Sequence, residues 1–208
     1  MSLEKIKKLK NTAETEFIEK KSVFIGLAVS INNEEEAQEI IKQRKKKYSD
    51  ATHNVYAYIL GNGAISRYSD DAEPQGTAGM PVLNAIRMSG ITNVLVIVTR
   101  YFGGILLGAG GLVRAYSASA AMTLEKAGFS IYEDYYVYSC ACSYSDYQKL
   151  QPLLNSFDVI IDNTDFSTDV EIKFAIKEDL ITNFEKKINE TFAGRIFLKY
   201  IETRLDTK

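Results

Sequence analysis

The sequence has little of several residue types on which common functional sites depend. Its 208 residues include one histidine, two cysteines and no tryptophan, and neither a G-x-S-x-G nor an H-E-x-x-H motif occurs. Zinc sites draw their ligands mainly from His and Cys, and the two motifs mark α/β-hydrolases and zinc-dependent proteases. The sequence therefore predicts no zinc centre built from His and Cys and neither of these enzyme classes.

Long apolar runs are also missing. No segment approaches the roughly 20 consecutive apolar residues of a membrane span. The N-terminal segment MSLEKIKKLKN is charged and lacks the apolar core of a signal peptide. We therefore expect a protein of the cytoplasm without a membrane partner.

Neither sign of charge is in large excess. Residues 1–132 carry 16 Lys and Arg against 13 Asp and Glu, residues 133–208 carry 9 against 14, and the net charge is −2. This uneven balance could orient the protein on a polyanion. It is far from the strongly basic balance typical of nucleic-acid-binding domains, so charge alone supports no function.

The two cysteines, Cys140 and Cys142, alternate with Ala141 in a strand-like run. Residues two apart on a strand point to the same face, and neighbours this close are poor disulfide partners. We expect both to be small core residues.

The most informative stretch runs from Asn93 to Gly128. Val94–Val98 is a continuous apolar run, which predicts a strand in the middle of a sheet or covered on both faces. A helix is predicted over Leu112–Ala127, with Gly128 at its C-terminal end. Between them lie five glycines, each expected where the backbone turns with positive φ or closely approaches another surface: Gly103, Gly104, Gly108, Gly110 and Gly111.

A glycine-rich loop before a helix can bind an anion, because free backbone N–H groups and the helix dipole favour negative charge there. The nucleotide motifs fail nevertheless, since Ala109 stands where a P-loop has lysine and Val113 where a dinucleotide fingerprint has its third glycine. Tight packing of the loop against neighbouring backbone explains the glycines equally well. Both interpretations stay open.

Three carboxylates, Asp70, Asp71 and Glu73, precede a segment that contains Gly76 and Thr77. Such a cluster could hold a hard cation such as Mg²⁺, or serve as acid and base if its pKa values differ. We favour the alternative that these residues stabilise a turn, cap the following helix or pair with arginines. The candidate partners are Arg67, Arg100 and Arg114.

His53 and the basic run Lys42–Lys47 have structural interpretations that we favour. A catalytic histidine needs a nucleophile or carboxylate beside it, which the sequence does not place. The basic run ends a predicted helix, where it complements the helix dipole, although it could also contact phosphate.

Hydrophobic periodicity outlines the other elements. The first half is expected to hold a hairpin over Thr15–Ile31, a helix capped by Asn32 or Asn33, strands Thr52–Leu60 and Ile65–Tyr68, and a helix from near Thr77–Pro81. The second half reads βαββαβ, the order of a ferredoxin-like sandwich. Its elements are Tyr135–Ala141, Asp146–Leu154, Val159–Ile161, a turn at Asn163–Asp165, Val170–Ile176, Lys177–Thr191 and Arg195–Ile201.

Two motifs together resemble the signature of the YigZ/IMPACT family: RYFGGILLGAGGLVRAY, and upstream, at Asp70–Leu83, DDAEPQGTAGMPVL. The family pattern usually reads Asp-Asp-Gly-Glu-Pro-Ser-Gly, whereas this chain has Ala72 and Gln75. The resemblance implies an α+β fold with two domains. The first, residues 1–132, would be similar to the second domain of ribosomal protein S-five and the fourth domain of elongation factor G. The second, residues 133–208, would be a ferredoxin-like βαββαβ domain similar to the fifth domain of that factor.

The eukaryotic relatives regulate translation. The resemblance therefore implies a binding module that contacts the ribosome, RNA or a translation protein, with Arg67, Arg100, Arg114 and Lys45–Lys47 as phosphate contacts. The same superfamily includes small-molecule kinases with a glycine-rich phosphate loop. A phosphate- or nucleotide-binding protein or enzyme is thus the alternative, and no cofactor is identified.

Under either function we expect the DDAEPQGTAG segment and the glycine loop to meet in one site beside an open cleft. Arg100 and Arg114 would lie near the carboxylates and balance their charge. The expected binding residues are Asp70, Asp71, Glu73, Gly76, Thr77, Arg100, Gly103, Gly104, Gly108, Gly110, Gly111 and Arg114.

Overall fold

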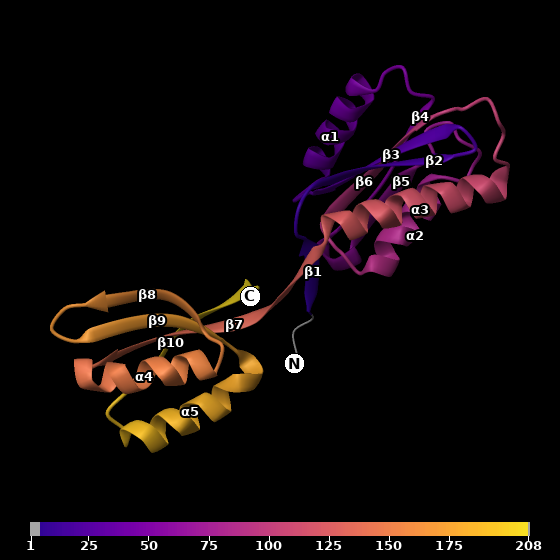
Figure 1. Cartoon of the computed structure of the whole chain (residues 1–208). Helices are drawn as coiled ribbons and strands as arrows, with labels where there is room; N and C mark the ends of the chain where they lie inside the picture. Colours follow the sequence, from indigo (N-terminus) through magenta and orange to yellow (C-terminus); the bar gives the residue numbers. More distant parts are fainter. Residues whose placement is uncertain (1–4, 208) are drawn as a thin grey trace. The chain divides into compact units, whose positions relative to one another are not determined.

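The computed structural model describes residues 5–207, which divide into two compact units (Figure 1). The N-terminal domain comprises residues 6–131, and the C-terminal domain comprises residues 132–207 together with Lys5. The division falls within one strand, β7 (Phe129–Cys142). No helix among residues 5–207 is long and apolar enough to cross a membrane.

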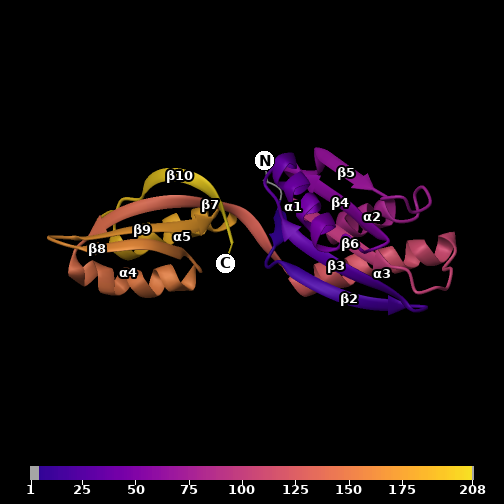
Figure 2. The ribbon, with the colours of Figure 1, turned by 90° about the horizontal axis from the view of Figure 1, so that it is seen from above.

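The N-terminal domain is built on an antiparallel sheet with the strand order β2-β3-β6-β4-β5 (Figure 2). These strands are β2 (Ala13–Glu19), β3 (Ser22–Ser30), β4 (His53–Leu60), β5 (Ile65–Ser69) and β6 (Val94–Tyr101), and the short β1 (Ile6–Leu9) precedes them. The hairpins β2–β3 and β4–β5 lie where the sequence predicts them. β6 is central and almost completely buried, as its apolar run indicates.

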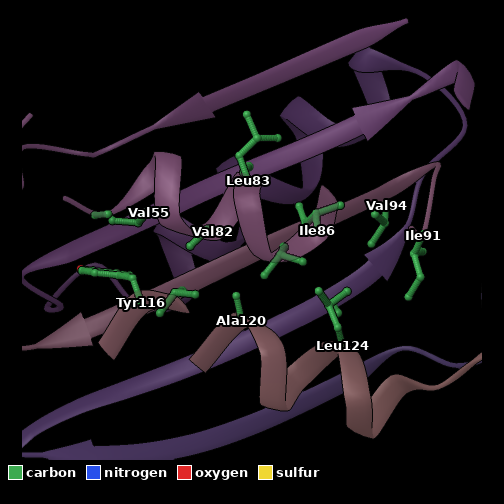
Figure 3. Packing of buried hydrophobic residues seen from close by; sticks show 14 of the residues in the cluster. Val55, Val82, Leu83, Ile86, Ile91, Val94, Tyr116, Ala120 and Leu124 are labelled. Atoms are coloured by element: carbon green, nitrogen blue, oxygen red, sulfur yellow. The ribbon is translucent and has the colours of Figure 1, made fainter. Parts of the chain in front are cut away.

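Helices cover both faces of this sheet. α1 (Glu34–Lys47), capped by Asn33, packs on one face around Ile41 and Tyr58. α2 (Gly79–Ser89) and α3 (Ala109–Ala127) pack on the other. Figure 3 shows this larger core, in which side chains of α2 and α3 meet those of the sheet.

Two boundaries around the glycine loop differ from those predicted. β6 continues to Tyr101, so Arg100 belongs to the strand. α3 begins at Ala109, three residues before the predicted start at Leu112, so Gly110 and Gly111 lie in its first turn and not in the loop. The local reason is Gly108, whose φ of 71° sets the helix entry and whose carbonyl accepts from Leu112 N.

The C-terminal domain has the ferredoxin-like order βαββαβ, as predicted. Its strands are paired in the order β10-β7-β9-β8, each pair antiparallel, and the helices lie on one face (Figure 1). β1 joins the same sheet by pairing with β7. The other elements are α4 (Tyr144–Ser156), β8 (Ile160–Phe166), β9 (Val170–Lys177), α5 (Glu178–Phe192) and β10 (Lys199–Asp206).

Two expectations in this domain were wrong in detail and one is confirmed. Asn163–Asp165 lies within β8 and forms no turn, because β8 continues to Phe166 with a register shift between Ile161 and Asn163. β10 begins at Lys199, later than the predicted Arg195. Cys140 and Cys142 are free, buried members of the core, as expected.

Candidate functional site

A cavity of about 360 Å³ opens at one end of the N-terminal domain. It lies where the start of β4, the β5–α2 segment and the β6–α3 loop meet. The residues that line it are Thr52, His53, Ala72, Glu73, Pro74, Arg100, Phe102, Leu106, Leu107, Gly108, Ala109 and Leu112. Glu73 and Gly108 thus face the same cavity, in agreement with the expectation that the two motifs meet beside a cleft.

The polar side of the cavity is a buried charge cluster centred on Glu73. Its Oε1 accepts from Arg100 Nη1 at 2.6 Å and from the Tyr116 hydroxyl at 2.7 Å. Glu73 and Arg100 are 7% and 5% exposed, so each is a buried charge that needs the other. Burial and the Glu73 carboxylate raise the pKa of Tyr116 far above its ordinary value, which keeps its hydroxyl a donor.

Aromatic rings enclose the Arg100 guanidinium. Its centre lies 5.5 Å from the ring centroid of Phe24 and 5.6 Å from that of Phe102. Nη2 lies 3.4 Å from Ser22 Oγ, whereas Nε is buried with no hydrogen-bond partner among residues 5–207. A buried donor without a partner costs free energy, and such sites are often functional.

His53 presents one ring nitrogen to this cluster. Its Nδ1 lies 2.8 Å from the carbonyl oxygen of Asp71, and because a carbonyl only accepts, Nδ1 carries a proton. Nε2 then points toward Glu73 Oε1, 3.7 Å away. A neutral ring would offer Nε2 as an acceptor, and a charged ring would offer it as a donor.

Two acceptor atoms of residues that line the cavity are without a hydrogen-bond partner among the described residues. Glu73 Oε2 and His53 Nε2 make no hydrogen bond among the described residues, and both residues line the cavity. The cavity therefore combines apolar walls with a polar end that is ready to receive donors.

The backbone beside the cluster is strained. Asp71 and Ala72 have φ values of 45° and 68°, in the left-handed region that favours glycine. Side-chain contacts hold the segment, since Asp71 accepts from Asn54 N at 2.6 Å and pairs with Lys45 at 2.5 Å. This strain lies at Ala72, the position where the family pattern has glycine.

Asp70 has a different role from its neighbours. Its carboxylate accepts from the backbone N–H groups of Gly76, Ala78 and Gly79, at 2.9, 3.1 and 2.8 Å, and so caps α2 from outside the helix. Thr77 is buried and donates to Pro74 O. Asp70, Gly76 and Thr77 are therefore engaged in holding the segment and do not line the cavity. Among residues 5–207 no three His, Cys, Asp or Glu side chains form a metal ligand set.

The loop glycines serve separate purposes. A Cβ on Gly103 would lie 2.0 Å from the carbonyl carbon of Lys21, so this glycine lets the loop touch the β2–β3 turn. Gly104 and Gly108 have φ values of 83° and 71°. A Cβ on Gly110 would meet nothing closer than 3.6 Å, so the expectation that every glycine answers a backbone need was wrong there.

Arg114 is the clearest error of the expected site. It lines two other cavities and makes no ion pair with the carboxylates in the described structure. Consecutive helical residues are about 100° apart, so Arg114 and Tyr116 differ by about 200° around α3. Because Tyr116 faces Glu73, Arg114 faces away. The surface pair of Arg67 is with Glu34.

Sequence reasoning missed His53, Tyr116 and Phe102 as parts of the site. The contact that orients His53 is with a backbone carbonyl, which leaves no trace in residue type. Phe102 offered a usable signal in the sequence, because it is a large aromatic residue directly before two glycines. In the structure its side chain is 45% exposed.

Comparisons with known proteins agree with the architecture. Residues 20–124 match the model of the Impact N-terminal domain, and residues 140–195 match a domain of unknown function, DUF1949. The chain is 34% identical to IMPACT family member YvyE of Bacillus subtilis (strain 168), over 92% of this chain and 88% of the relative. It is 32% identical to YigZ of Escherichia coli (strain K12), over 88% of this chain and 91% of the relative.

Two further matches extend the comparison. A crystal structure described as that of a hypothetical protein has a TM-score of 0.60 and 29% identity, covering 96% of this chain and 98% of the other. The Protein IMPACT homolog of Dictyostelium discoideum is 40% identical over 43% of this chain and 27% of its own length. On the domain matches and the near full-length relatives, the chain belongs to the IMPACT family.

Proposed function

We propose that this protein is a translation-linked binding module whose N-terminal domain contacts RNA, free or within the ribosome, around the cavity of Arg100 and Glu73. The family resemblance supports the link to translation. The observation that carries the proposal is the exposed, apolar β6–α3 loop, where Leu106 is 83% exposed beside a cavity with buried charges. Exposed apolar groups next to such a cavity are typical of a binding surface.

Exposed lysines lie near this loop and near the β5–α2 segment. Lys21 contacts Gly103 through its backbone, and Lys20 lines a neighbouring cavity that shares Leu107 with the first. Lys45 pairs with Asp71, while Lys46 and Lys47 are exposed at the end of α1. Positive side chains around an apolar loop fit a phosphate backbone with bases between the phosphates.

Co-sedimentation with ribosomes and binding to labelled RNA at low salt test the proposal. We expect affinity to fall steeply with salt, because phosphate contacts release counterions. Charge reversal of Lys46 and Lys47 to Glu should weaken binding. The same change at Lys186 and Lys187, exposed on α5, is the matched control and should have little effect. Absence of binding at micromolar protein would refute the proposal.

The cavity itself favours a second candidate, a small phosphorylated or nucleotide ligand. Its volume of about 360 Å³ lies within the range of small-molecule sites. A thermal-shift screen with nucleotides and phosphorylated metabolites, with and without Mg²⁺, tests this reading. A melting temperature unchanged by every compound would reject it.

A further inference from the structure

We propose that the cavity between Phe102 and Glu73 binds one unstacked base of single-stranded RNA and prefers bases that carry an exocyclic amino group. This inference rests on the proposed function and specifies how the RNA would be recognised. It follows from the walls of the cavity, from its two unpaired acceptors and from the charges around it.

The walls suit a flat, weakly polar ring. Phe102 is 45% exposed, and the Arg100 guanidinium lies over its ring, 5.6 Å from the centroid. Leu106 and Pro74, both exposed, contribute further apolar surface. Single-stranded bases are commonly recognised by stacking on such aromatic rings, whereas a paired base cannot enter a cavity.

The polar end selects for donors. Glu73 Oε2 belongs to the carboxylate that is paired with Arg100, and a carboxylate oxygen accepts hydrogen bonds. His53 Nε2 is an acceptor when the ring is neutral, because Nδ1 donates to Asp71 O. Cytosine, adenine and guanine offer amino groups to such acceptors. Uracil has a carbonyl oxygen at the position where cytosine has its amino group.

The same carboxylate excludes a phosphate from the inner end of the cavity. Arg100 is already paired with Glu73, so the cluster presents no uncompensated positive charge to an anion. Phosphates would instead stay outside, near Lys20 and Lys21. A cationic side chain of a protein partner would also suit the acceptors, but these lysines would repel a basic segment.

Fluorescence anisotropy with the full chain tests the inference. The probes are labelled oligocytidine and oligouridine of about ten nucleotides, a length within the site sizes of single-strand binders. We expect Phe102→Ala to weaken oligocytidine binding about tenfold, because stacking on the ring is lost. Phe129→Ala is the matched control, since Phe129 is 47% exposed and also lies beside a cation, Lys7. It should leave the affinity unchanged.

Base preference provides the second readout. The unmodified protein should bind oligocytidine about tenfold more tightly than oligouridine, as expected for a well-placed base contact. Glu73→Gln should remove this preference, because an amide can also donate to the uracil oxygen. Thermal melting verifies that each variant is folded, and Phe102→Ala stands alone if Glu73→Gln does not fold.

The outcomes separate the two proposals. RNA binding that is insensitive to Phe102→Ala, or equal affinity for the two oligonucleotides, would overturn the base-binding cavity and leave the RNA-binding function in place. No binding of either oligonucleotide and no association with ribosomes would overturn both.

Discussion

The two domains place their charged side chains in opposite ways. In the N-terminal domain Arg44, Glu73 and Arg100 are buried, and every buried polar residue identified among residues 5–207 belongs to this domain. In the C-terminal domain the ion pairs are partly exposed, as for Arg204 with Asp162 and Lys177 with Glu133.

This difference indicates where function is located. Buried ion pairs contribute little net stability, because desolvation offsets their attraction, so their presence beside a cavity suggests a role other than stability. Exposed ion pairs have a small desolvation cost, so their presence says little about where function is located. The C-terminal domain instead has an apolar core under two helices, around Phe174 and Phe184. We therefore assign recognition to the N-terminal domain.

The largest expected effect follows from removing one member of the buried pair. Glu73→Ala should destabilise the N-terminal domain by about 3–5 kcal/mol, because it leaves the Arg100 charge unpaired. Asp162→Ala, which breaks the exposed pair with Arg204, should cost the C-terminal domain at most about 1 kcal/mol. Native-state hydrogen exchange reports on the domains separately. Equal losses of stability from the two substitutions would contradict the contrast between a buried and an exposed ion pair.

The next effect concerns two adjacent glycines. Gly103→Ala should cost about 3 kcal/mol, because its Cβ would overlap the backbone of Lys21 and displace the loop. Gly104→Ala should cost about 1–2 kcal/mol, since only its φ of 83° is unfavourable and the space around it is open. Denaturation by urea measures both. A larger cost for Gly104→Ala than for Gly103→Ala would mean that the loop can move away from the β2–β3 turn to make room for the added Cβ.

The C-terminal domain should lose stability at high pH because of a buried thiol in its core. Burial raises the pKa of Cys140 from its ordinary value of 9.0 to about 12. The unfolded thiol ionises first, so stability is complete below pH 9 and falls as pH rises through 12. Between pH 7 and 10 the loss should be about 1.4 kcal/mol. Hydrogen exchange at both pH values, compared with Cys140→Ala, measures it. An equal loss in the variant would mean that Cys140 is not responsible.

The smallest effect should be a gain. Ala72→Gly should stabilise the N-terminal domain by about 0.5–1 kcal/mol, since glycine adopts a φ of 68° without strain. The control is Ala64→Gly, because Ala64 has a φ of −60° and should gain nothing. The shift in urea midpoint decides, and a loss at Ala72 would show that its left-handed backbone is not strained.

Much of the fold could be predicted from periodicity, but the site only in part. Alternating and continuous apolar runs predicted β3 and β6, and periodicity predicted the βαββαβ order of the C-terminal domain. These signals are local. The pairing of Glu73 with Arg100 needs the fold to bring β6 and the β5–α2 segment together, and sequence could only name Arg100 among three candidates.

The misplaced residues have a common cause. Arg114 was assigned to the site because it follows the glycine loop, yet the start of α3 at Ala109 and the helical turn direct it elsewhere. Asn163–Asp165 reads as a turn by residue type, but pairing with β9 keeps it extended. In both cases the structure depends on tertiary contacts that the local sequence does not indicate.

The single oxygen at the centre of the charge cluster also bears on the order of folding. Glu73 Oε1 joins partners that lie 27 and 43 residues away in the chain, on β6 and α3. These contacts can form only after the central sheet and α3 have come together, so they should be largely absent from the folding transition state. Disrupting them should then accelerate unfolding while leaving the folding rate nearly unchanged. The cluster would thus slow the unfolding of the N-terminal domain without affecting how fast the domain folds.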